Sequence, residues 1–347
     1  MRAIVIRNTG GPDVLRCEQI PDPTPGPRDV VVKVSRCGVC FHDVVIRNGV
    51  MKRGVVLPCI PGHEIAGEVV AVGGDVTLFR QGDRVASTQR YYICGKCKFC
   101  RTGREPLCAQ MKFLGDVGLF GGYCEFVAIS EDNLAVVPDN VPLEHAAIAA
   151  CTIGTILNAI REVGNVSPGE RVLVTGAGGG LGMHSVQLAR LAGAEVIALT
   201  TSPEKVEQVR AAGADHVVLG TRGEDFSKQV MELTKGEGVD VCIDNVGSQV
   251  FQGVRRSMAI SGRWVLIGQL TGDFVPFNPA QLFFRSISML SATSTTREQL
   301  KDCLQLLSLG RIKPSISQTL PLVEAPAAHT MVEAGHSLGR ILINPAA

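Results

Sequence analysis

One stretch of the chain decides its fold: Arg171-Val-Leu-Val-Thr175, followed directly by Gly176-Ala177-Gly178-Gly179-Gly180-Leu181-Gly182. The apolar residues before Gly176 predict a short buried strand, and Leu181 to Ala192 predict a helix. A glycine-rich turn between the two lets the backbone approach a pyrophosphate, which the free amides of the helix N-terminus bind. The spacing does not match G-x-G-x-x-G, because Ala177 takes the first glycine place of the closest fit. The order of strand, turn and helix still predicts a dinucleotide site on these residues.

The residues after 150 continue this pattern of strands alternating with helices, which is typical of a doubly wound parallel sheet. A helix is expected from Pro203 to Ala212, with proline at its start. Further strands are expected at residues 195–200, 217–219, 239–243, 263–267 and 287–290. We therefore expect a dinucleotide-binding domain over residues 151–291.

Residues 1–145 have a different, β-rich pattern, in which proline and glycine separate apolar runs. Strands of a small barrel-like domain are expected at residues 30–35, 67–72 and 126–129. Near the C-terminus we expect one helix, from Glu298 to Leu309, and a closing strand, from Arg340 to Ile343. These elements are expected to complete the first domain, which then comprises residues 1–150 and 292–347.

The composition disfavours several classes of function. The 347 residues suffice for two domains, and a net charge of +1 provides no basic field for nucleic acid or an anionic membrane. The N-terminus is too short and too charged for a signal peptide core, and no apolar run approaches the roughly 20 residues that span a bilayer. Twelve cysteines without an export signal indicate a reducing, cytoplasmic compartment. A small-molecule substrate is expected, with no nucleic-acid or membrane partner.

Four cysteines lie close together in Cys94-Gly-Lys-Cys97-Lys-Phe-Cys100 and Cys108. Two-residue gaps allow their thiolates to surround one zinc ion at about 2.3 Å each. The alternatives are four unrelated thiols or two disulfides, which the repeated spacing and the expected compartment disfavour. A zinc site closed by four cysteines is structural, so we expect this one to stabilise the fold without taking part in chemistry.

A second set of metal-binding side chains is dispersed along the chain. Cys40 lies in Cys37-Gly-Val-Cys40-Phe-His-Asp43, His63 and Glu64 lie in Pro61-Gly-His-Glu64, and Cys151 opens Cys151-Thr-Ile-Gly-Thr155. Each is a weak signal alone, since a lone cysteine is usually a small core residue. Together, two cysteines and a histidine form the three-ligand set of a catalytic zinc ion, whose fourth position Glu64 can enter and leave.

The motifs together resemble those of the zinc-containing medium-chain dehydrogenase/reductase superfamily, the alcohol dehydrogenase-like proteins. The resemblance covers essentially the whole chain. Its markers, in family order, are Cys37-Gly-Val-Cys40, Pro61-Gly-His-Glu64, Gly82-Asp-Arg-Val85, the four-cysteine run, Cys151 and the glycine loop.

The resemblance implies a chaperonin-10-like β-rich catalytic domain with an inserted Rossmann domain. It implies two zinc ions per chain, one catalytic on Cys40, His63 and Cys151, and one structural. Asp43 matches the carboxylate that orients the histidine ligand, and Thr155 matches a residue near the nicotinamide. A homodimer or homotetramer is also implied, with edge strands near residues 285–291 in contact.

The chain departs from the resemblance at the proton relay. Many members carry Ser or Thr two places after the zinc cysteine and often His three places further, whereas this chain has His42 and Val45. An imidazole that titrates at about pH 6.5 can replace this relay. The alternative is that His42 only hydrogen-bonds the cofactor or its neighbours. Phe41 replaces a basic pyrophosphate contact and is expected to line the substrate pocket or the cofactor cleft.

The end of the strand at residues 195–200 indicates which nicotinamide cofactor binds. An NAD site has Asp or Glu there, but this strand ends Thr200-Thr201-Ser202-Pro-Glu204-Lys205. Hydroxyls and a lysine suit a 2′-phosphate, so NADP(H) is favoured over NAD(H). The alternative is that Lys205 is a solvated helix residue and Glu204 reaches the ribose. Asn245 and Gly268 complete the expected cofactor-binding residues.

Three functions are open at this point. The first is a zinc-dependent alcohol dehydrogenase or carbonyl reductase that transfers a hydride between NADP(H) and an alcohol, aldehyde or ketone. The second is an NADPH-dependent enoyl reductase, of the acryloyl-CoA or quinone type, which acts on an activated carbon–carbon double bond and lacks the usual relay. The third is a nucleotide-binding protein without chemistry, which two complete ligand sets disfavour.

Overall fold

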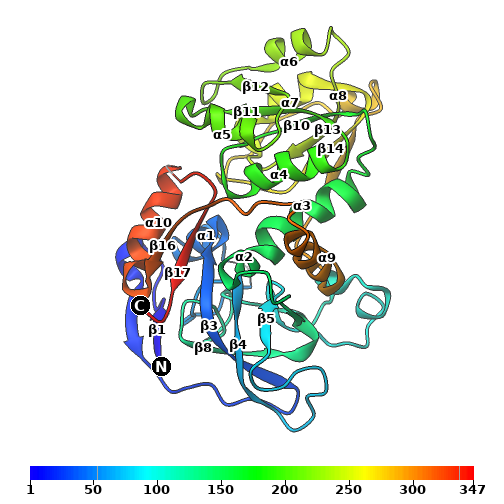
Figure 1. The fold of residues 1–347 in the computed structure, drawn as a ribbon. Coiled ribbons are helices and arrows are strands. Elements are labelled where there is room, and N and C mark those ends of the chain that lie inside the picture. Colours follow the sequence, from blue (N-terminus) through cyan, green and yellow to red (C-terminus); the bar gives the residue numbers. More distant parts are fainter. Residues whose placement is uncertain (53, 336) are drawn as a thin grey trace. The chain divides into compact units, whose positions relative to one another are not determined.

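The computed structural model describes residues 1–52, 54–335 and 337–347. The chain divides into two compact units, unit 1 (Met1–Gly154 and Ser294–Ala347) and unit 2 (Thr155–Thr293), which are coloured along the sequence in Figure 1. The sequence predicts a division after residue 150, whereas the structure keeps Cys151 in unit 1. The reason is that its segment, η5 (Ala149–Gly154), packs against α9 (Arg297–Ser308) and β5 (Arg84–Ser87) of that unit.

Unit 2 contains a six-stranded parallel sheet with the order β12-β11-β10-β13-β14-β15. The order reverses on either side of the first strand, β10 (Arg171–Val174), which is the doubly wound arrangement of dinucleotide-binding folds. The other strands are β11 (Glu195–Thr200), β12 (His216–Leu219), β13 (Val239–Asp244), β14 (Met258–Leu266) and β15 (Ser288–Ser291). Five of the six strands agree with the sequence prediction within two residues, and β14 begins five residues earlier than predicted.

Helices connect these strands. The helices of unit 2 are α3 (Thr155–Leu157), α4 (Gly180–Leu191), α5 (Val206–Ala211), α6 (Ser227–Leu233), α7 (Phe251–Ser257) and α8 (Ala280–Phe283). Shorter or irregular turns are the π-helical η6 (Asn158–Val163) and the 3-10 turns η7 (Pro203–Lys205) and η8 (Ser248–Val250). The expected helix from Pro203 to Ala212 is therefore η7 followed by α5.

A buried carboxylate connects the carboxyl ends of β10 and β13, which is the edge of the sheet where the dinucleotide site is expected. Asp244 Oδ1 accepts hydrogen bonds from the Thr175 hydroxyl at 2.8 Å and from the amides of Val246 and Gly247 at 3.0 and 3.1 Å. Its Oδ2 accepts a bond from the indole nitrogen of the fully buried Trp264 at 3.0 Å. These bonds satisfy a group whose burial raises its pKa.

Unit 1 contains a seven-stranded sheet with the order β16-β17-β3-β4-β5-β9, in which β8 also pairs with β3. The pairs are antiparallel apart from β16 with β17. The strands are β3 (Asp29–Val39), β4 (Ile65–Val72), β5, β8 (Phe126–Ser130), β9 (Leu134–Val136), β16 (Ile316–Pro321) and β17 (Arg340–Asn344). Two small ribbons, β1 (Arg2–Val5) with β2 (Arg16–Gln19) and β6 (Arg90–Tyr92) with β7 (Lys112–Phe113), complete the β structure.

The remaining elements of unit 1 are short helices and turns. The α-helices are α1 (Phe41–Arg47), α2 (Leu143–Ala147), α9 and α10 (Ala325–Ala334). The 3-10 turns are η1 (Pro12–Val14), η2 (Cys100–Thr102), η3 (Glu105–Leu107), η4 (Glu131–Asn133) and η9 (Leu322–Glu324). The predicted C-terminal helix and closing strand correspond to α9 and β17.

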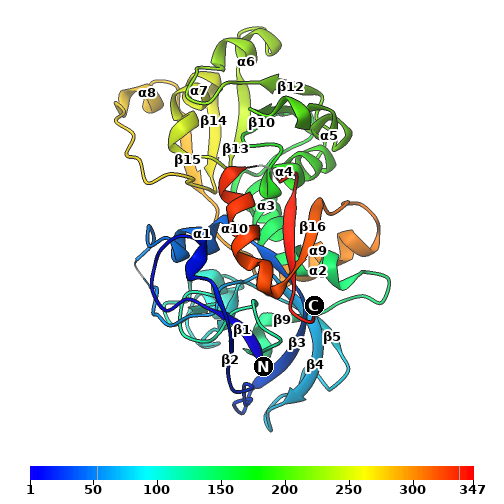
Figure 2. The ribbon, with the colours of Figure 1, turned by 90° about the vertical axis from the view of Figure 1, so that its left-hand side faces the viewer.

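Two C-terminal elements, β16 and α10, were not predicted from the sequence. Helix α10 has a proline in its first turn and ends at Gly335, whose φ of +71° makes it a left-handed cap. Strand β16 pairs in parallel with β17, and α10 packs against both strands, as Figure 2 shows. This C-terminal segment therefore extends the sheet of unit 1 beside β3, the strand that leads to Cys40.

Candidate functional site

The dispersed metal-binding residues meet in unit 1. One ligand atom each from Cys40, His63, Glu64 and Cys151 lies within 4.8 Å of the other three. Cys40 directly precedes α1, His63 and Glu64 directly precede β4, and Cys151 lies in η5. Two sulfurs, one imidazole nitrogen and one carboxylate oxygen form a donor set that suits zinc. We call these four residues the open cluster.

The charges around the open cluster favour a thiolate, which is the form that binds metal. The pKa of Cys40 lies well below its usual value because the Cys151 thiol hydrogen-bonds to it, and because Arg340 and His63 are close. The same pairing raises the pKa of Cys151 well above its usual value. A buried site that already stabilises negative charge on sulfur fits a divalent cation.

Asp43 fixes the orientation of His63. Burial lowers the pKa of His63, but the Asp43 carboxylate, 3.2 Å from Nδ1, raises it well above its usual value. Asp43 Oδ1 also accepts the amide of Gly62 at 3.1 Å, and Oδ2 accepts the amide of Cys40 at 2.9 Å. Because Nδ1 faces a carboxylate, Nε2 is the nitrogen left for a metal. The position of Asp43 agrees with the orienting role that the resemblance implies.

Glu64 is fully buried and is held by the C-terminal strand β17. Its Oε1 forms an ion pair of 2.9 Å with Arg340 Nη2, and its Oε2 accepts the Thr152 hydroxyl at 3.1 Å. Arg340 Nε also donates to Thr152 Oγ1 at 2.8 Å. Burial raises the pKa of Glu64 to about 6, although Arg340 opposes this shift. A Cβ on Gly38 would lie 2.1 Å from Glu64 Oε2, so only glycine fits there.

His42 lies beside the open cluster, and its ring is held by a carboxylate that sequence reasoning missed. His42 Nε2 is 2.8 Å from Asp116 Oδ1. The ring centroid is 5.2 Å from that of His63 and 4.9 Å from that of Phe113. Asp116 follows β7 and is 7% exposed. His42 thus occupies the expected relay position, with its ring held by Asp116.

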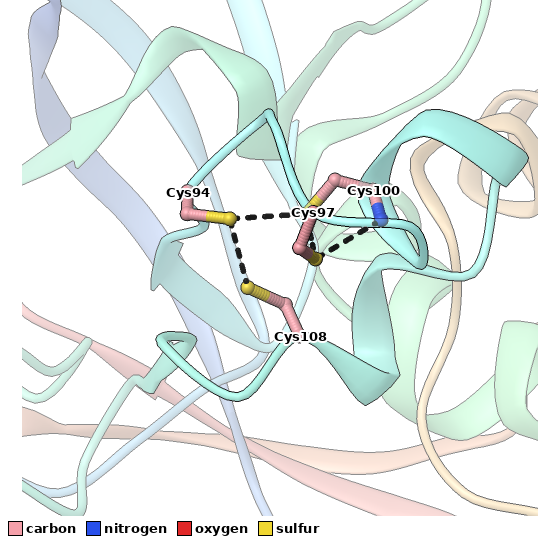
Figure 3. Close-up of side chains that lie close together, drawn as sticks. All are labelled: Cys94, Cys97, Cys100 and Cys108. Carbon is pink, nitrogen blue, oxygen red and sulfur yellow. Dashed lines mark hydrogen bonds between the residues drawn. The ribbon is translucent and has the colours of Figure 1, made fainter.

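The four-cysteine run forms a separate cluster on the loop between β6 and β7 (Figure 3). The Sγ–Sγ distances are 3.5 Å for Cys97–Cys100, 3.5 Å for Cys94–Cys108 and 4.0 Å for Cys94–Cys100. Four ligands at about 2.3 Å from a tetrahedral zinc ion lie about 3.8 Å from one another. All twelve cysteines are free, so the disulfide alternative is not what the structure contains.

Backbone amides favour the thiolate form of one cysteine of this cluster, which is the form that binds a cation. The amides of Lys96 and Cys97 lower the pKa of Cys94 to about 6. The loop is tied to the C-terminal part of unit 1, because Glu105 Oε1 accepts the amide of Arg297 at 2.6 Å. Arg90, the first residue of β6, donates to Ser294 Oγ and to the carbonyl of Thr295, each at 2.7 Å. The cluster is therefore placed to stabilise the junction of two distant segments.

The glycine loop of unit 2 is a tight turn in which several backbone groups lie close together. Gly176 has a φ of +61°, which favours glycine. A Cβ on Gly182 would lie 2.1 Å from the carbonyl oxygen of Gly176, so glycine lets α4 pack tightly on the turn. Ala177 is buried, and its amide donates to Leu199 O at 2.9 Å. Gly178 and Gly179 precede α4, while Gly180 and Leu181 form its first residues.

Lys205 lies over this loop rather than in solvent. A Cβ on Gly178 would come within 2.7 Å of Lys205 Cδ, and Lys205 is 6% exposed. Burial lowers its pKa, the Glu204 carboxylate raises it, and the charge of Arg222, which follows β12, lowers it. Thr200 Oγ1 accepts the amide of Ser202 at 3.3 Å, while Thr201 is exposed. Two cations and a hydroxyl-rich turn therefore gather near the end of β11.

The other expected cofactor residues have different surroundings. The Asn245 amide group donates to Thr175 O at 3.0 Å and Ser185 Oγ at 3.3 Å, so both of its hydrogens stay within the protein. Gly268 lines a cavity of about 460 Å³ at the carboxyl ends of β13, β14 and β15, where α/β sheets bind ligands. Thr155, the first residue of α3, is buried.

Comparisons with known proteins identify the family of the chain. Residues 26–139 match the family described as alcohol dehydrogenase GroES-like domain, and residues 180–308 match the family described as zinc-binding dehydrogenase. The chain belongs to the zinc-containing medium-chain dehydrogenase/reductase superfamily. It is therefore an oxidoreductase of a zinc-binding, NAD(P)-linked family, as the motifs predicted.

Three members of the superfamily show how similar the chain is to known proteins. An acryloyl-coenzyme A reductase of Sulfurisphaera tokodaii is 32% identical over 346 residues, covering 99% of this chain and 100% of the relative. An NAD-dependent alcohol dehydrogenase of Sulfolobus acidocaldarius is 33% identical, covering 98% of each chain. A crystal structure described as AibC is 42% identical, with a TM-score of 0.91, covering 99% of this chain and 95% of that one.

Several residues that support the candidate sites were not predicted from the sequence. Arg340 and Thr152 hold Glu64, Asp116 holds His42, and Arg222 lies near Lys205. None belongs to a motif with fixed spacing, so only the fold brings them to the site. No helix in the described part of the chain is long and apolar enough to cross a membrane.

Proposed function

We propose that the chain is an NADPH-dependent reductase of enoyl thioesters, which adds hydrogen across a carbon–carbon double bond conjugated to a thioester carbonyl. The observation that supports this proposal most directly is the identity of the residues at the two proton-relay positions. His42 is held by Asp116 at 2.8 Å, and Val45 occupies the place of the second relay residue. An alcohol dehydrogenase must carry a proton away from an alcohol oxygen, and this chain lacks the hydroxyl that usually does so. Relatives named acryloyl-coenzyme A reductase support the same class of substrate.

The residues of the open cluster fit the chemistry that this reduction needs. When bound, NADPH supplies a hydride, and a zinc ion on Cys40, His63 and Cys151 supplies a Lewis acid for the thioester oxygen. Glu64 and Arg340 hold the buried side of the cluster, and Asp43 keeps His63 in place. Asp116 accepts the Nε2–H of His42, so Nδ1 is the ring nitrogen that would take up a proton from solvent and deliver it to the substrate. The hydride goes to the β-carbon and the proton to the α-carbon, which balances the reaction.

The surroundings of Lys205 support NADPH as the reductant. Arg222 lies close enough to lower the pKa of Lys205, and the first carboxylate after β11 is Glu204, four residues beyond its end. Two such cations near Thr201 and Ser202 suit the 2′-phosphate of NADPH and leave the ribose of NADH without its usual acidic partner.

We expect Arg222→Ala to raise the KM for NADPH about tenfold, which corresponds to one lost hydrogen bond to a charged group. The KM for NADH should change little. Steady-state kinetics with both cofactors measures this, and Arg210→Ala, which removes an exposed arginine of α5, is the matched control. A wild-type preference for NADH, or an equal effect of both substitutions, would contradict the proposal.

Alcohol or carbonyl turnover remains a second candidate, because the open cluster includes every ligand of a catalytic zinc site. A panel of acryloyl and crotonyl thioesters, aldehydes, ketones and alcohols separates the two functions. We expect saturated thioesters as products, with kcat/KM for thioesters at least a hundredfold above that for aldehydes. Turnover of aldehydes to alcohols with intact thioesters would favour the second candidate.

We also propose that two copies associate through unit 2. Strand β15 is the edge of its sheet, and its outer side has no partner among the described strands. On the segment that precedes β15 in the sequence, Phe274, Phe283 and Phe284 are 99%, 63% and 81% exposed, which is unusual for a monomer. Sedimentation of the protein should give the mass of a dimer or a multiple of it, and a monomer at micromolar concentration would refute this proposal.

A further inference from the structure

We infer that Tyr123 and His329 are positioning residues for the metal site: they form a hydrogen-bonded chain that holds Asp43, and through it His63. The inference rests on the proposed role of Cys40, His63 and Cys151 as metal ligands. It assigns a function to helix α10, which no sequence motif marks.

The series of hydrogen bonds begins at the carboxylate of Asp43. Its Oδ1 lies 3.2 Å from His63 Nδ1 and accepts the Gly62 amide. Its Oδ2 accepts the Cys40 amide at 2.9 Å and the Tyr123 hydroxyl at 3.4 Å. Three hydrogen bonds and the ion pair with His63 therefore surround the carboxylate. The Tyr123 hydroxyl supplies the fourth partner and limits how the carboxylate can rotate.

The next link is between Tyr123 and His329, whose Oη and Nε2 are 3.3 Å apart. A hydroxyl has one hydrogen, and Asp43 can only accept, so the Tyr123 hydrogen is directed to Asp43 and His329 Nε2 must donate. Both side chains are fully buried, and His329 Nδ1 has no hydrogen-bond partner in the described structure. Burial lowers the pKa of His329 to about 4, which is consistent with a neutral ring that carries its hydrogen on Nε2.

A second contact keeps α10 in register with α1, the helix that carries Asp43. Arg47 and Glu333 form two hydrogen bonds, of 2.6 and 3.1 Å, and Arg47 is 1% exposed. Asp43 and Arg47 are one helical turn apart on α1, and His329 and Glu333 are one turn apart on α10. Helices α1 and α10 are thus connected twice, by the Arg47–Glu333 ion pair and by the hydrogen bonds from Asp43 through Tyr123 to His329. The second connection leads to the metal site.

Zinc affinity tests the inference in the full-length protein. We expect Tyr123→Phe to raise the zinc dissociation constant of the open cluster about tenfold, as is typical when the support of a ligand is lost. The affinity of the four-cysteine cluster should not change, so that cluster is an internal control. Competition with a chromophoric chelator measures both constants, and Tyr92→Phe, which alters an exposed tyrosine, is the matched control.

The His329 variants test whether the hydrogen bond, and not packing, is responsible. We expect His329→Leu to weaken zinc binding as Tyr123→Phe does, and His329→Gln, which keeps a donor, to restore most of the affinity. The double variant Tyr123→Phe/His329→Leu should be no weaker than either single variant, because both interrupt one chain. If Tyr123→Phe does not fold, the two His329 variants decide the question.

The possible outcomes separate this inference from the proposed function. Two zinc ions per wild-type chain with unchanged affinity in the variants would overturn the inference and leave the proposed metal site intact. Equal loss in His329→Leu and His329→Gln would also overturn it, because a purely structural role would not distinguish them. A wild-type chain that binds zinc only at the four-cysteine cluster would overturn both proposals.

Discussion

Replacing Cys40 by serine is expected to lower kcat/KM for an enoyl thioester about a thousandfold while the protein stays folded. The reason is that the open cluster loses one of its two sulfur ligands, and a Lewis acid on the substrate oxygen is worth several kcal/mol, where about 4 kcal/mol corresponds to a thousandfold in rate. Serine keeps nearly the size of cysteine at this buried position just before α1, so the fold should be retained. Steady-state kinetics together with zinc content per chain measures the effect.

The matched control for this prediction is Cys17→Ser, which alters an exposed thiol far from either cluster in the sequence. The control should keep wild-type turnover and two zinc ions. If Cys40→Ser lost one zinc ion and kept full turnover, the open cluster would not be the site of the chemistry.

Replacing Cys97 by serine is expected to act on stability first. The four-cysteine loop joins η3 to the start of α9 through Glu105 and Arg297, so a weakened metal site should loosen two segments of unit 1. Loss of a structural metal belongs to the few changes that cost about 4 kcal/mol, which corresponds to a fall in melting temperature of about 10 °C for a unit of this size. Differential scanning calorimetry measures the shift.

The turnover of the folded fraction of Cys97→Ser at 25 °C should stay within about threefold of wild type, because this cluster contributes no group to the open cluster. Cys17→Ser again serves as the control for a lost thiol. A Cys97 variant that kept its melting temperature and lost only the chemical step would refute the division between a structural and a chemical metal site.

The sequence was sufficient to predict the elements whose residues lie in fixed local patterns. The glycine loop after β10, the four-cysteine run and the parallel sheet implied by alternating strands and helices each depend on local sequence patterns, and the structure contains all three. Cys40, His63 and Cys151 are far apart in sequence, and the family resemblance, not their spacing, indicated that they meet.

What the sequence could not reveal are contacts between segments that share no motif. Arg340 reaches Glu64 from the last strand, and His329 reaches Tyr123 from α10. Helix α10 is rich in alanine and β16 is largely polar on one side, so neither has a strong periodic pattern. Asp116 lies in a loop, where only the fold decides which side chain it contacts. Such polar partners are found from the coordinates of the folded chain.

The position of the transferred hydrogen tests the central claim most directly. The protein would be supplied with a crotonyl thioester and NADPH carrying deuterium at the transferable C4 position, and the product would be examined by NMR. The proposed function predicts a saturated thioester with one deuterium on its β-carbon and a solvent-derived hydrogen on its α-carbon. Deuterium at the carbonyl carbon of an aldehyde or alcohol product, with the double bond intact, would contradict it.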